Sequence, residues 1–284
     1  MEKFASPAKL NLMLRVVGQR EDGYHLLETV FTLIDLYDWI TITPRSDSQI
    51  ILADANYHIP LEDDLAIRAA KILQKTTQCP LGAEIQVHKT LPMGGGLGGG
   101  SSNAATVLMA LNHLWECGLS RQELMNIGVQ IGADVPFFIF GQTAFAQGIG
   151  EKLEPYSFPE QHYVIIRPPV SIATAKIFHE WDLTHKSSYE KIQSFGGAGN
   201  NVLSKQLFCN DLQDIVLKHY PDVVLALSEL KKYGNAVMTG SGSCVFVAVK
   251  SRTEAEEIAS QLRSSFEVFV ASSLKHHPLF HLLE

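Results

Sequence analysis

Cysteine is scarce in this sequence, and the residues that occur are widely separated. The four cysteines are Cys79, Cys117, Cys209 and Cys244, and no two of them form a CxxC pair. This spacing argues against a disulfide framework and against a structural zinc site. We expect buried thiols in a reducing compartment.

Dense runs of basic residues are also lacking. The sequence has 23 Lys and Arg against 30 Asp and Glu, a formal net charge of −7 at pH 7 with His neutral. An acidic surface repels polyanions on average, so we expect neither nucleic acid nor a membrane as a partner. His276, His277 and His281 could suggest a metal site, but Pro278 and the chain end favour a surface segment, and we reject that site.

Long apolar runs are absent as well. Lys9, Asn11 and Arg15 interrupt the N-terminal apolar stretch, unlike a signal peptide. No later segment is apolar for long enough to cross a bilayer. We therefore expect a cytoplasmic protein. Its 284 residues, 46% of them hydrophobic, are enough for one large domain or two of ordinary size.

Alternation with a period of two predicts that the first hundred residues are rich in strands. Leu10, Leu12 and Leu14 alternate with less apolar positions, which predicts a half-buried strand with Lys9 and Asn11 on the opposite face. Further predictions are a turn at 21–25, strand-like segments at 26–45 and 82–91, and an amphipathic helix that begins around Asp63 and runs to 77.

Helices alternate with strands in the rest of the chain. Residues 101–118 read as a buried helix with a Ser N-cap, and Ser120 with Glu123 forms a capping box that starts another helix. Prolines make a domain boundary plausible near 152–160. The remaining predictions are a strand at Tyr163–Arg167, helices within 213–234, and strands at 236–240, 244–250 and 266–274.

Six glycines lie among the nine residues 92–100, directly before the predicted helix. A flexible linker is a poor interpretation, because linkers need polar or disordered flanks. Gly94, Gly96 and Gly99 satisfy the dinucleotide-binding pattern G-x-G-x-x-G, but Pro92 separates them from the strand, and no acid-tipped strand follows the helix. The third interpretation is a phosphate cradle, with backbone N–H groups turned towards a triphosphate and two serine hydroxyls at the positive end of a helix.

Residues 92–102 follow the pattern P-x-x-x-G-L-G-x-x-S-S, which resembles the signature of the GHMP kinases. The segments SPAKLNL at 6–12, GYHLLETVF at 23–31, GADVPFF at 132–138 and TGSGSCVF at 239–246 are similar to one branch of that superfamily. Members of this branch phosphorylate the 2-hydroxyl of 4-diphosphocytidyl-2-C-methyl-D-erythritol in the non-mevalonate isoprenoid pathway. The resemblance spans nearly the whole chain.

The resemblance implies an α+β fold of two domains. Residues 1–155 would form an ATP-binding domain like ribosomal protein S5 domain 2. Residues 156–284 would form a ferredoxin-like, substrate-binding domain, with the tail from about 271 returning to the first domain. ATP and Mg2+ are the implied cofactors, although we identify no Mg2+ ligands in the sequence. The partner would be the small-molecule substrate, and the protein a monomer or homodimer.

The resemblance also implies the site residues. Asp134 would be the catalytic base, because a carboxylate can accept the proton of an attacking hydroxyl, and Lys9 would keep it ionised. The implied cofactor-binding residues are Pro92, Met93, Gly94, Gly95, Gly96, Leu97, Gly98, Gly99, Gly100, Ser101, Ser102, Asp64 and Lys89. The implied substrate-binding residues are Asn11, Tyr24, His25, Thr174, Phe178, Gly240 and Ser241.

Structural interpretations compete with these roles when each residue is taken alone. Asp134 followed by Val-Pro is suited to start a helix, Lys9 could be exposed at a strand edge, and Phe178 could be a core residue. Asp64 stands where the family commonly has Asn near the adenine. Two alternative functions stay open: another GHMP kinase, acting on a sugar or homoserine, and a non-catalytic nucleotide-binding module.

Overall fold

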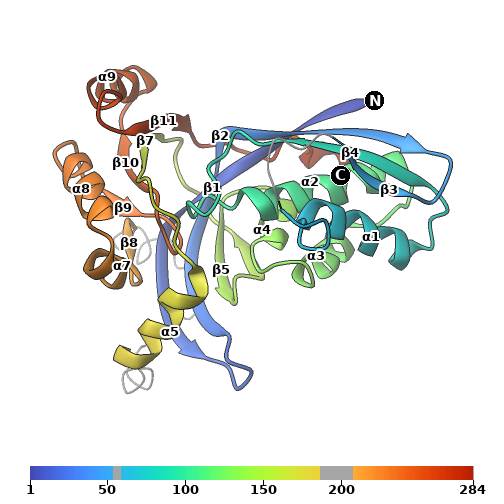
Figure 1. The fold of residues 1–284 in the computed structure, drawn as a ribbon, viewed down its shortest axis with the longest axis horizontal. Helices are drawn as coiled ribbons and strands as arrows, with labels where there is room; N and C mark the ends of the chain where they lie inside the picture. Colours follow the sequence, from blue (N-terminus) through green and yellow to red (C-terminus); the bar gives the residue numbers. More distant parts are fainter. Residues whose placement is uncertain (54–58, 186–206, 284) are drawn as a thin grey trace.

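The computed structural model describes residues 1–53, 59–185 and 207–283, in which two β-sheets pack against helices (Figure 1). The first part of the chain contains β1 (Glu2–Gln19), β2 (His25–Arg45), β3 (Ile50–Ala53), α1 (Leu65–Thr77), β4 (Gly82–His88), α2 (Gly99–Leu114), α3 (Arg121–Val129), α4 (Val135–Phe140), β5 (Ala144–Gly148) and β6 (Lys152–Pro155). The second part contains β7 (His162–Arg167), α5 (Thr174–His185), β8 (Cys209–Asn210), α7 (Gln213–His219), α8 (Pro221–Leu230), β9 (Val237–Met238), β10 (Val245–Val249), α9 (Arg252–Leu262), β11 (Glu267–Ser272) and the 3₁₀ turn η2 (Phe280–Leu283).

The larger sheet is built on a long antiparallel ribbon of β1 and β2. Its strand order is β3-β4-β2-β1-β8, and β5 and β6 branch from β2. The ribbon pairs from Glu2↔Ile42 to Gln19↔His25, and its turn projects away from the sheet, below the rest of the molecule in Figure 1. The predicted strands at 10–17 and 26–45 are confirmed as parts of this ribbon. The expectation that the first of them is half-buried is corrected, because Lys9 and Asn11 are each only 3% exposed, like the leucines beside them.

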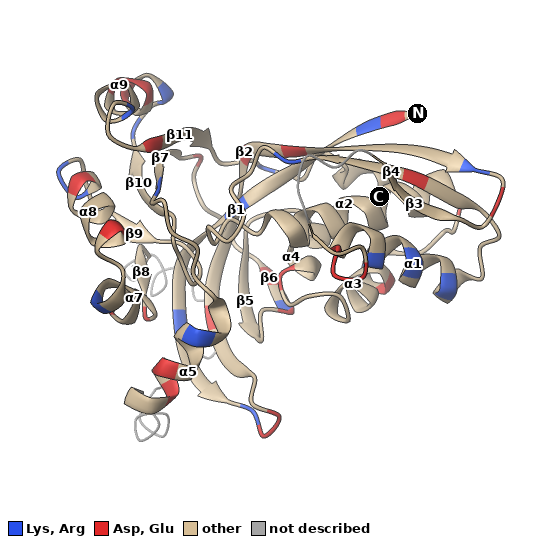
Figure 2. Ribbon diagram, viewed as in Figure 1, with Lys and Arg blue, Asp and Glu red and all other residues tan. Residues whose placement is uncertain are grey.

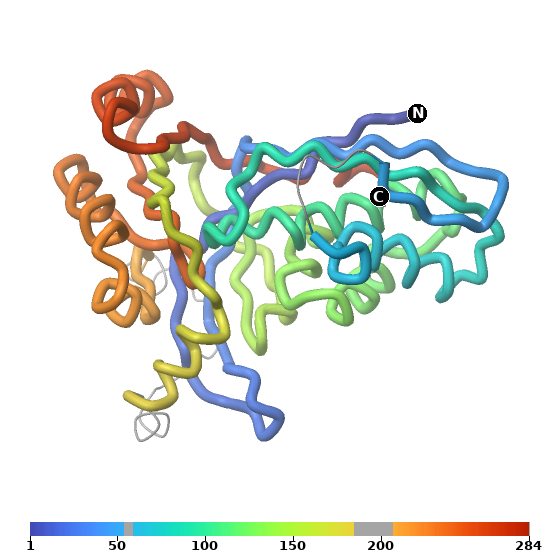
Figure 3. Tube along the Cα trace, viewed as in Figure 1, coloured from blue at the N-terminus to red at the C-terminus, as the bar shows by residue number. Residues whose placement is uncertain are grey.

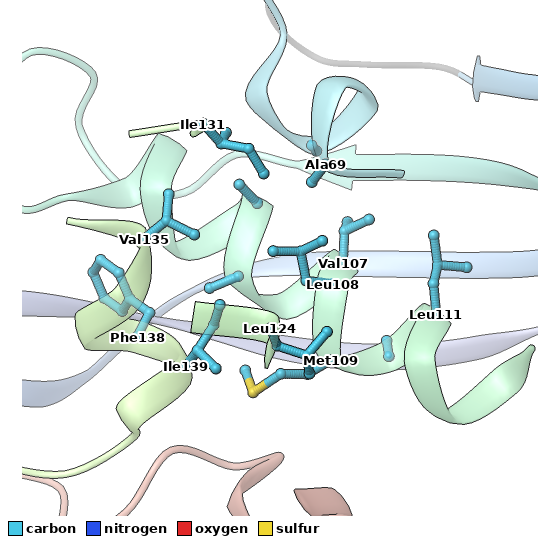
Figure 4. Packing of buried hydrophobic residues seen from close by; sticks show 14 of the residues in the cluster. Ala69, Val107, Leu108, Met109, Leu111, Leu124, Ile131, Val135, Phe138 and Ile139 are labelled. Carbon is cyan, nitrogen blue, oxygen red and sulfur yellow. The ribbon is translucent and has the colours of Figure 1, made fainter. Parts of the chain in front are cut away.

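The core of this half lies between the sheet and helices α1 to α4. Helix α2 is buried on nearly every side because it is made of small and apolar residues, as a central helix requires. Val107, Leu108 and Leu111 of α2 lie in one cluster with Leu124 and Ile139 (Figure 4). Their packing fixes the start of α2, and with it the end of the glycine run.

The smaller sheet has the order β11-β7-β10-β9. Its core includes Val164, Ile166 and Val247 from the sheet, packed with side chains of α7, α8 and α9. The trace in Figure 3 passes from β11 back to the first half of the molecule. There the N–H of Leu274 donates to the carbonyl of Leu33 at 2.8 Å, and Leu279 lies in the first core.

Several sequence expectations are corrected by the structure. The N-cap of α2 is Gly98, not a serine, because the helix begins two residues before Ser101. The capping box of Ser120 and Glu123 is confirmed. The histidine segment is not a surface segment: His277 is 2% exposed, and its N–H donates to the carbonyl of Gly141 at 2.7 Å.

Residues of both charge signs lie around α9 and at the tip of the β1–β2 ribbon (Figure 2). Salt bridges at the two places join Arg263 to Glu256 and Arg20 to Asp22. Within the described residues, no helix is long and apolar enough to cross a membrane.

Candidate active site

A cleft of about 1160 Å³ is lined by elements of both halves of the molecule. It contains the glycine loop, which we define as residues 92–100, and the second glycine turn, residues 240–242. The start of α1, the middle of β1, the β1–β2 turn and one face of α5 complete its walls. The structure therefore brings together residues more than 200 positions apart in sequence.

Two carbonyl groups of the glycine loop are bonded to neighbouring segments of the protein. The carbonyl of Leu97 accepts the N–H of Lys9 at 3.0 Å, and that of Gly95 accepts the N–H of Cys244 at 3.1 Å. In a trans peptide the next N–H points the opposite way, so the N–H groups of Gly96 and Gly98 point away from these partners. The first N–H groups of α2 add further donors, since they have no acceptor within the helix. This arrangement suits an anion.

Only glycine fits at the crowded positions of this loop. Gly96 has φ +78°, and a Cβ there would lie 2.3 Å from the carbonyl oxygen of Thr239. Gly98 has φ +73°, and its Cβ would meet Phe138 at 2.9 Å and Lys9 at 3.1 Å. The glycines therefore permit a left-handed backbone and a close approach to neighbouring segments.

The two serines after the loop differ in position. Ser101 lines the cleft, as expected. Ser102 is fully buried, and its hydroxyl donates to the carbonyl of Pro7 at 2.6 Å. Its N–H is bonded to the carbonyl of Gly98. The expectation that both hydroxyls face the ligand is corrected, because Ser102 ties α2 to β1 instead.

Lys9 and Asp134 meet beside the glycine loop. The Lys9 Nζ lies 3.3 Å from Asp134 Oδ2, and the two side chains are 4% and 32% exposed. Lys9 Nζ also donates to Asn11 Oδ1 at 2.5 Å. Asp134 precedes α4, but its side chain makes no capping hydrogen bond. Its carboxylate is thus held by the ammonium group while it still borders the cleft.

Asp64, at the start of α1, and Lys89, whose Nζ lies beside Gly99 at the start of α2, both line the cleft, and each is held by a neighbouring group. Asp64 Oδ1 accepts the N–H groups of Ala66 and Ile67 at 2.9 and 3.1 Å, so it caps α1. Lys89 Nζ donates to the fully buried carboxylate of Asp38. Its ammonium group is thereby fixed at the cleft wall.

Aromatic side chains line the far end of the cleft, where α5 lies beside the tip of the ribbon (Figure 1). His25 and Phe178 are stacked, with ring centroids 4.5 Å apart and planes inclined by 26°. Tyr24 is 58% exposed. The Thr174 and Ser241 hydroxyls are 2.7 Å apart, so α5 and the second glycine turn are joined at this wall.

The second glycine turn is held by residues that sequence reasoning missed. Asn210 Nδ2 donates to the carbonyls of Met238 and Gly240 at 2.7 and 2.8 Å. Thr239 Oγ1 accepts the N–H of Asn11 at 3.0 Å. Burial raises the pKa of the Cys244 thiol to about 12, so Cys244 is a neutral packing group behind the glycine loop.

Asp38 and Asp182 were also missed, although each holds a predicted site residue. Asp182 Oδ1 lies 2.7 Å from His25 Nε2. A carboxylate within a strand or helix pattern is a weak signal in sequence, because most such residues are solvated.

Comparison with known proteins matches residues 64–142 to the GHMP kinases N terminal domain and residues 189–268 to the GHMP kinases C terminal family. The chain is 49% identical over 278 residues to the 4-diphosphocytidyl-2-C-methyl-D-erythritol kinase of Neisseria meningitidis serogroup A, with 98% of this chain and 96% of the relative covered. It is 47% identical over 277 residues to the kinase of the same name from Chromobacterium violaceum, with the same coverage.

Solved structures agree with these relatives. A crystal structure of 4-(cytidine 5'-diphospho)-2C-methyl-D-erythritol kinase is similar with a TM-score of 0.78 and 30% identity, over 96% of this chain and 99% of that one. Homoserine kinase from Cytophaga hutchinsonii has a TM-score of 0.69 at 16% identity, over 97% and 95% of the chains, which shows a shared fold. With the glycine loop and the cleft, these matches show that the chain belongs to the 4-diphosphocytidyl-2-C-methyl-D-erythritol kinase family of the GHMP kinases.

Proposed function

We propose that this protein transfers the γ-phosphoryl group of ATP to the 2-hydroxyl of 4-diphosphocytidyl-2-C-methyl-D-erythritol. The observation that carries the proposal is the Lys9–Asp134 pair, 3.3 Å apart beside the glycine loop. Relatives that bear this kinase name align with 98% of the chain, which supports the same substrate here. The reaction would yield the 2-phosphate and ADP.

Asp134 is the proposed base. A carboxylate at the cleft wall can accept the proton of the attacking hydroxyl as the new bond to phosphorus forms. Lys9 favours the ionised carboxylate and adds positive charge near the transferring group. Asn11, which accepts from Lys9 at 2.5 Å, orients that ammonium and can contact the hydroxyls of the acceptor.

The glycine loop is the proposed binding site for the triphosphate. Backbone N–H groups turned away from Lys9 and Cys244, together with the start of α2, would hold the phosphate oxygens. Ser101 offers a hydroxyl oxygen at this end of the cleft, which fits Mg2+, since this ion binds few protein oxygens alongside phosphates and water. When bound, Mg2+ would neutralise developing phosphate charge. Asp64 at the start of α1 and Lys89 beside Gly99 would border the adenine nucleotide.

The aromatic end of the cleft is the proposed binding site for cytosine. Tyr24 and Phe178 would offer ring faces to a flat base, and His25, which is stacked on Phe178, lines the same part of the cleft. Thr174, Gly240 and Ser241 would border the diphosphate and erythritol between the base and the glycine loop.

We also propose that residues 1–155, with the tail from about 271, form one domain and that the remaining residues form the second. The proposal is supported by the change of sheet between β6 and β7 and by the burial of Leu279 in the first core. The short strand β8 of the second domain would then extend the sheet of the first by pairing with β1.

The proposed function is tested by ADP formation with a panel of alcohols. We expect turnover with 4-diphosphocytidyl-2-C-methyl-D-erythritol and none with homoserine or galactose; the opposite preference would refute the assignment. Asp134→Asn should lower kcat by about 10²- to 10⁴-fold, as loss of a general base does, while the Kd for ATP stays near that of the wild type. A normal kcat in this variant would remove the carboxylate from the mechanism.

A further inference from the structure

We propose that Asp182 is a positioning residue, which fixes the hydrogen-bonding role of His25 and so selects cytosine over uracil. This inference rests on the proposed function, since it concerns the base of that substrate. Asp182 lies on the face of α5 that also presents Ala175, Phe178 and His179 to the cleft, as the helical spacing of three and four residues requires.

The carboxylate of Asp182 joins two parts of the ribbon tip. Oδ1 lies 2.7 Å from Nε2 of His25, and Oδ2 accepts from Nε2 of Gln19 at 3.1 Å. The His25 side chain is 9% exposed and that of Asp182 is 21% exposed. The ring also stacks on Phe178, so His25 is held both along its edge and across its face.

An ionised carboxylate can only accept hydrogen bonds, so the His25 nitrogen that faces Asp182 must carry the proton. In the neutral ring this leaves Nδ1 as an acceptor. Among the described residues, Nδ1 has no hydrogen-bond partner. His25 is one of the residues that line the cleft, so a ligand bound there can offer a donor to Nδ1.

The chemistry of Nδ1 distinguishes the two pyrimidines. Cytosine carries an exocyclic amino group, which can donate to an acceptor, whereas uracil carries a carbonyl oxygen at the same position. An acceptor that faces this carbonyl leaves two lone pairs in contact and a polar group unpaired. A base stacked on the aromatic wall would therefore bind with the amino edge of cytosine towards Nδ1.

The test compares the cytidine substrate with its uridine analogue at pH 8. We expect the wild type to prefer the cytidine compound at least tenfold in kcat/KM. Asp182→Asn replaces a group that can only accept hydrogen bonds with an amide that can also donate one to Nε2 of His25. His25 can then carry its proton on Nδ1 instead. The preference should fall at least tenfold, mainly through the KM of the cytidine compound, with kcat nearly unchanged.

Glu180→Gln is the matched control. Glu180 lies on the same helix and also pairs with a histidine, His219, but neither residue lines the cleft. The control removes an equivalent charge from α5 and should leave the preference intact. If Asp182→Asn and Glu180→Gln have the same preference as the wild type, the inference is overturned.

A second measurement uses the unmodified protein. The ¹⁵N shifts of the His25 ring, assigned by the loss of its signals in His25→Gln, should show a protonated Nε2 and a bare Nδ1 at pH 8. A proton on Nδ1 would overturn the inference even if Asp182→Asn failed to fold. If the wild type phosphorylates neither compound, the proposed function fails, but the His25 tautomer and the relative affinities for CDP and UDP still test the role of Asp182.

Discussion

Gly96→Ala should separate the glycine loop from the second glycine turn. The new Cβ would lie 2.3 Å from the carbonyl oxygen of Thr239 and 3.2 Å from that of Gly242. An ordinary carbon–oxygen contact needs about 3.3 Å, so the loop must move by about 1 Å. A displacement of that size in a reacting geometry costs about 10²-fold, which is about 3 kcal/mol of transition-state stabilisation.

The assay is steady-state ADP formation with ATP and the alcohol varied in turn. We expect kcat/KM for ATP to fall by about 10²-fold. Gly118→Ala is the control, because Gly118 has φ +69° but no atom within 4 Å of an added Cβ. Both variants carry the cost of a left-handed alanine, about 1–2 kcal/mol, and only Gly96→Ala carries the clash. If the two variants have kcat/KM values within twofold of each other, the close approach of the loops is irrelevant to catalysis.

Three further predictions concern binding and stability. Tyr24→Ala should raise the KM of the alcohol about 5- to 150-fold, because base stacking contributes ~1–3 kcal/mol. The KM of ATP should not change. An unchanged KM of the alcohol would exclude stacking on Tyr24. Asp38→Asn, which places an amide against Lys89 Nζ, should raise the KM of ATP about tenfold, but have no further effect in a Lys89→Met background. Burial lowers the pKa of His277 to about 3 in the folded protein. As the pH falls below 6.5, His277 is protonated in the unfolded chain but not in the folded one, so the free energy of unfolding decreases. Between pH 7.5 and 5.5, His277 should lower the free energy of unfolding by about 1.4 kcal/mol, as measured by urea unfolding. The His277→Gln variant should lack this part of the pH dependence.

Local patterns predicted the parts of the fold that depend on neighbouring residues. The alternation along β1, the amphipathic pattern of α1 and the capping box at Ser120 are set within a few positions. The N-cap of α2 could not be predicted in this way. The N-cap is Gly98, where Lys9 and Phe138 leave no room for a side chain, and those contacts cannot be read from the local sequence.

The same distinction between local pattern and tertiary contact applies to the candidate site. The glycine pattern and its context predicted a phosphate-binding loop, while the pairing of Lys9 with Asp134 came from the family resemblance. Asp182 and His25 are 157 positions apart, so their contact depends on the tertiary fold. His277 was misjudged because proximity to the chain end is a poor guide to burial.

The β1–β2 ribbon carries groups for both ends of the proposed reaction. Its middle supplies Lys9 and Asn11 beside the glycine loop, and its tip supplies Tyr24 and His25. Because one paired ribbon joins them, the distance between the proposed cytosine site and the Lys9–Asp134 pair is set by covalent structure and strand pairing. If cytosine binds at the tip, an acceptor with one phosphate fewer or more between base and alcohol would present its hydroxyl out of reach of Asp134.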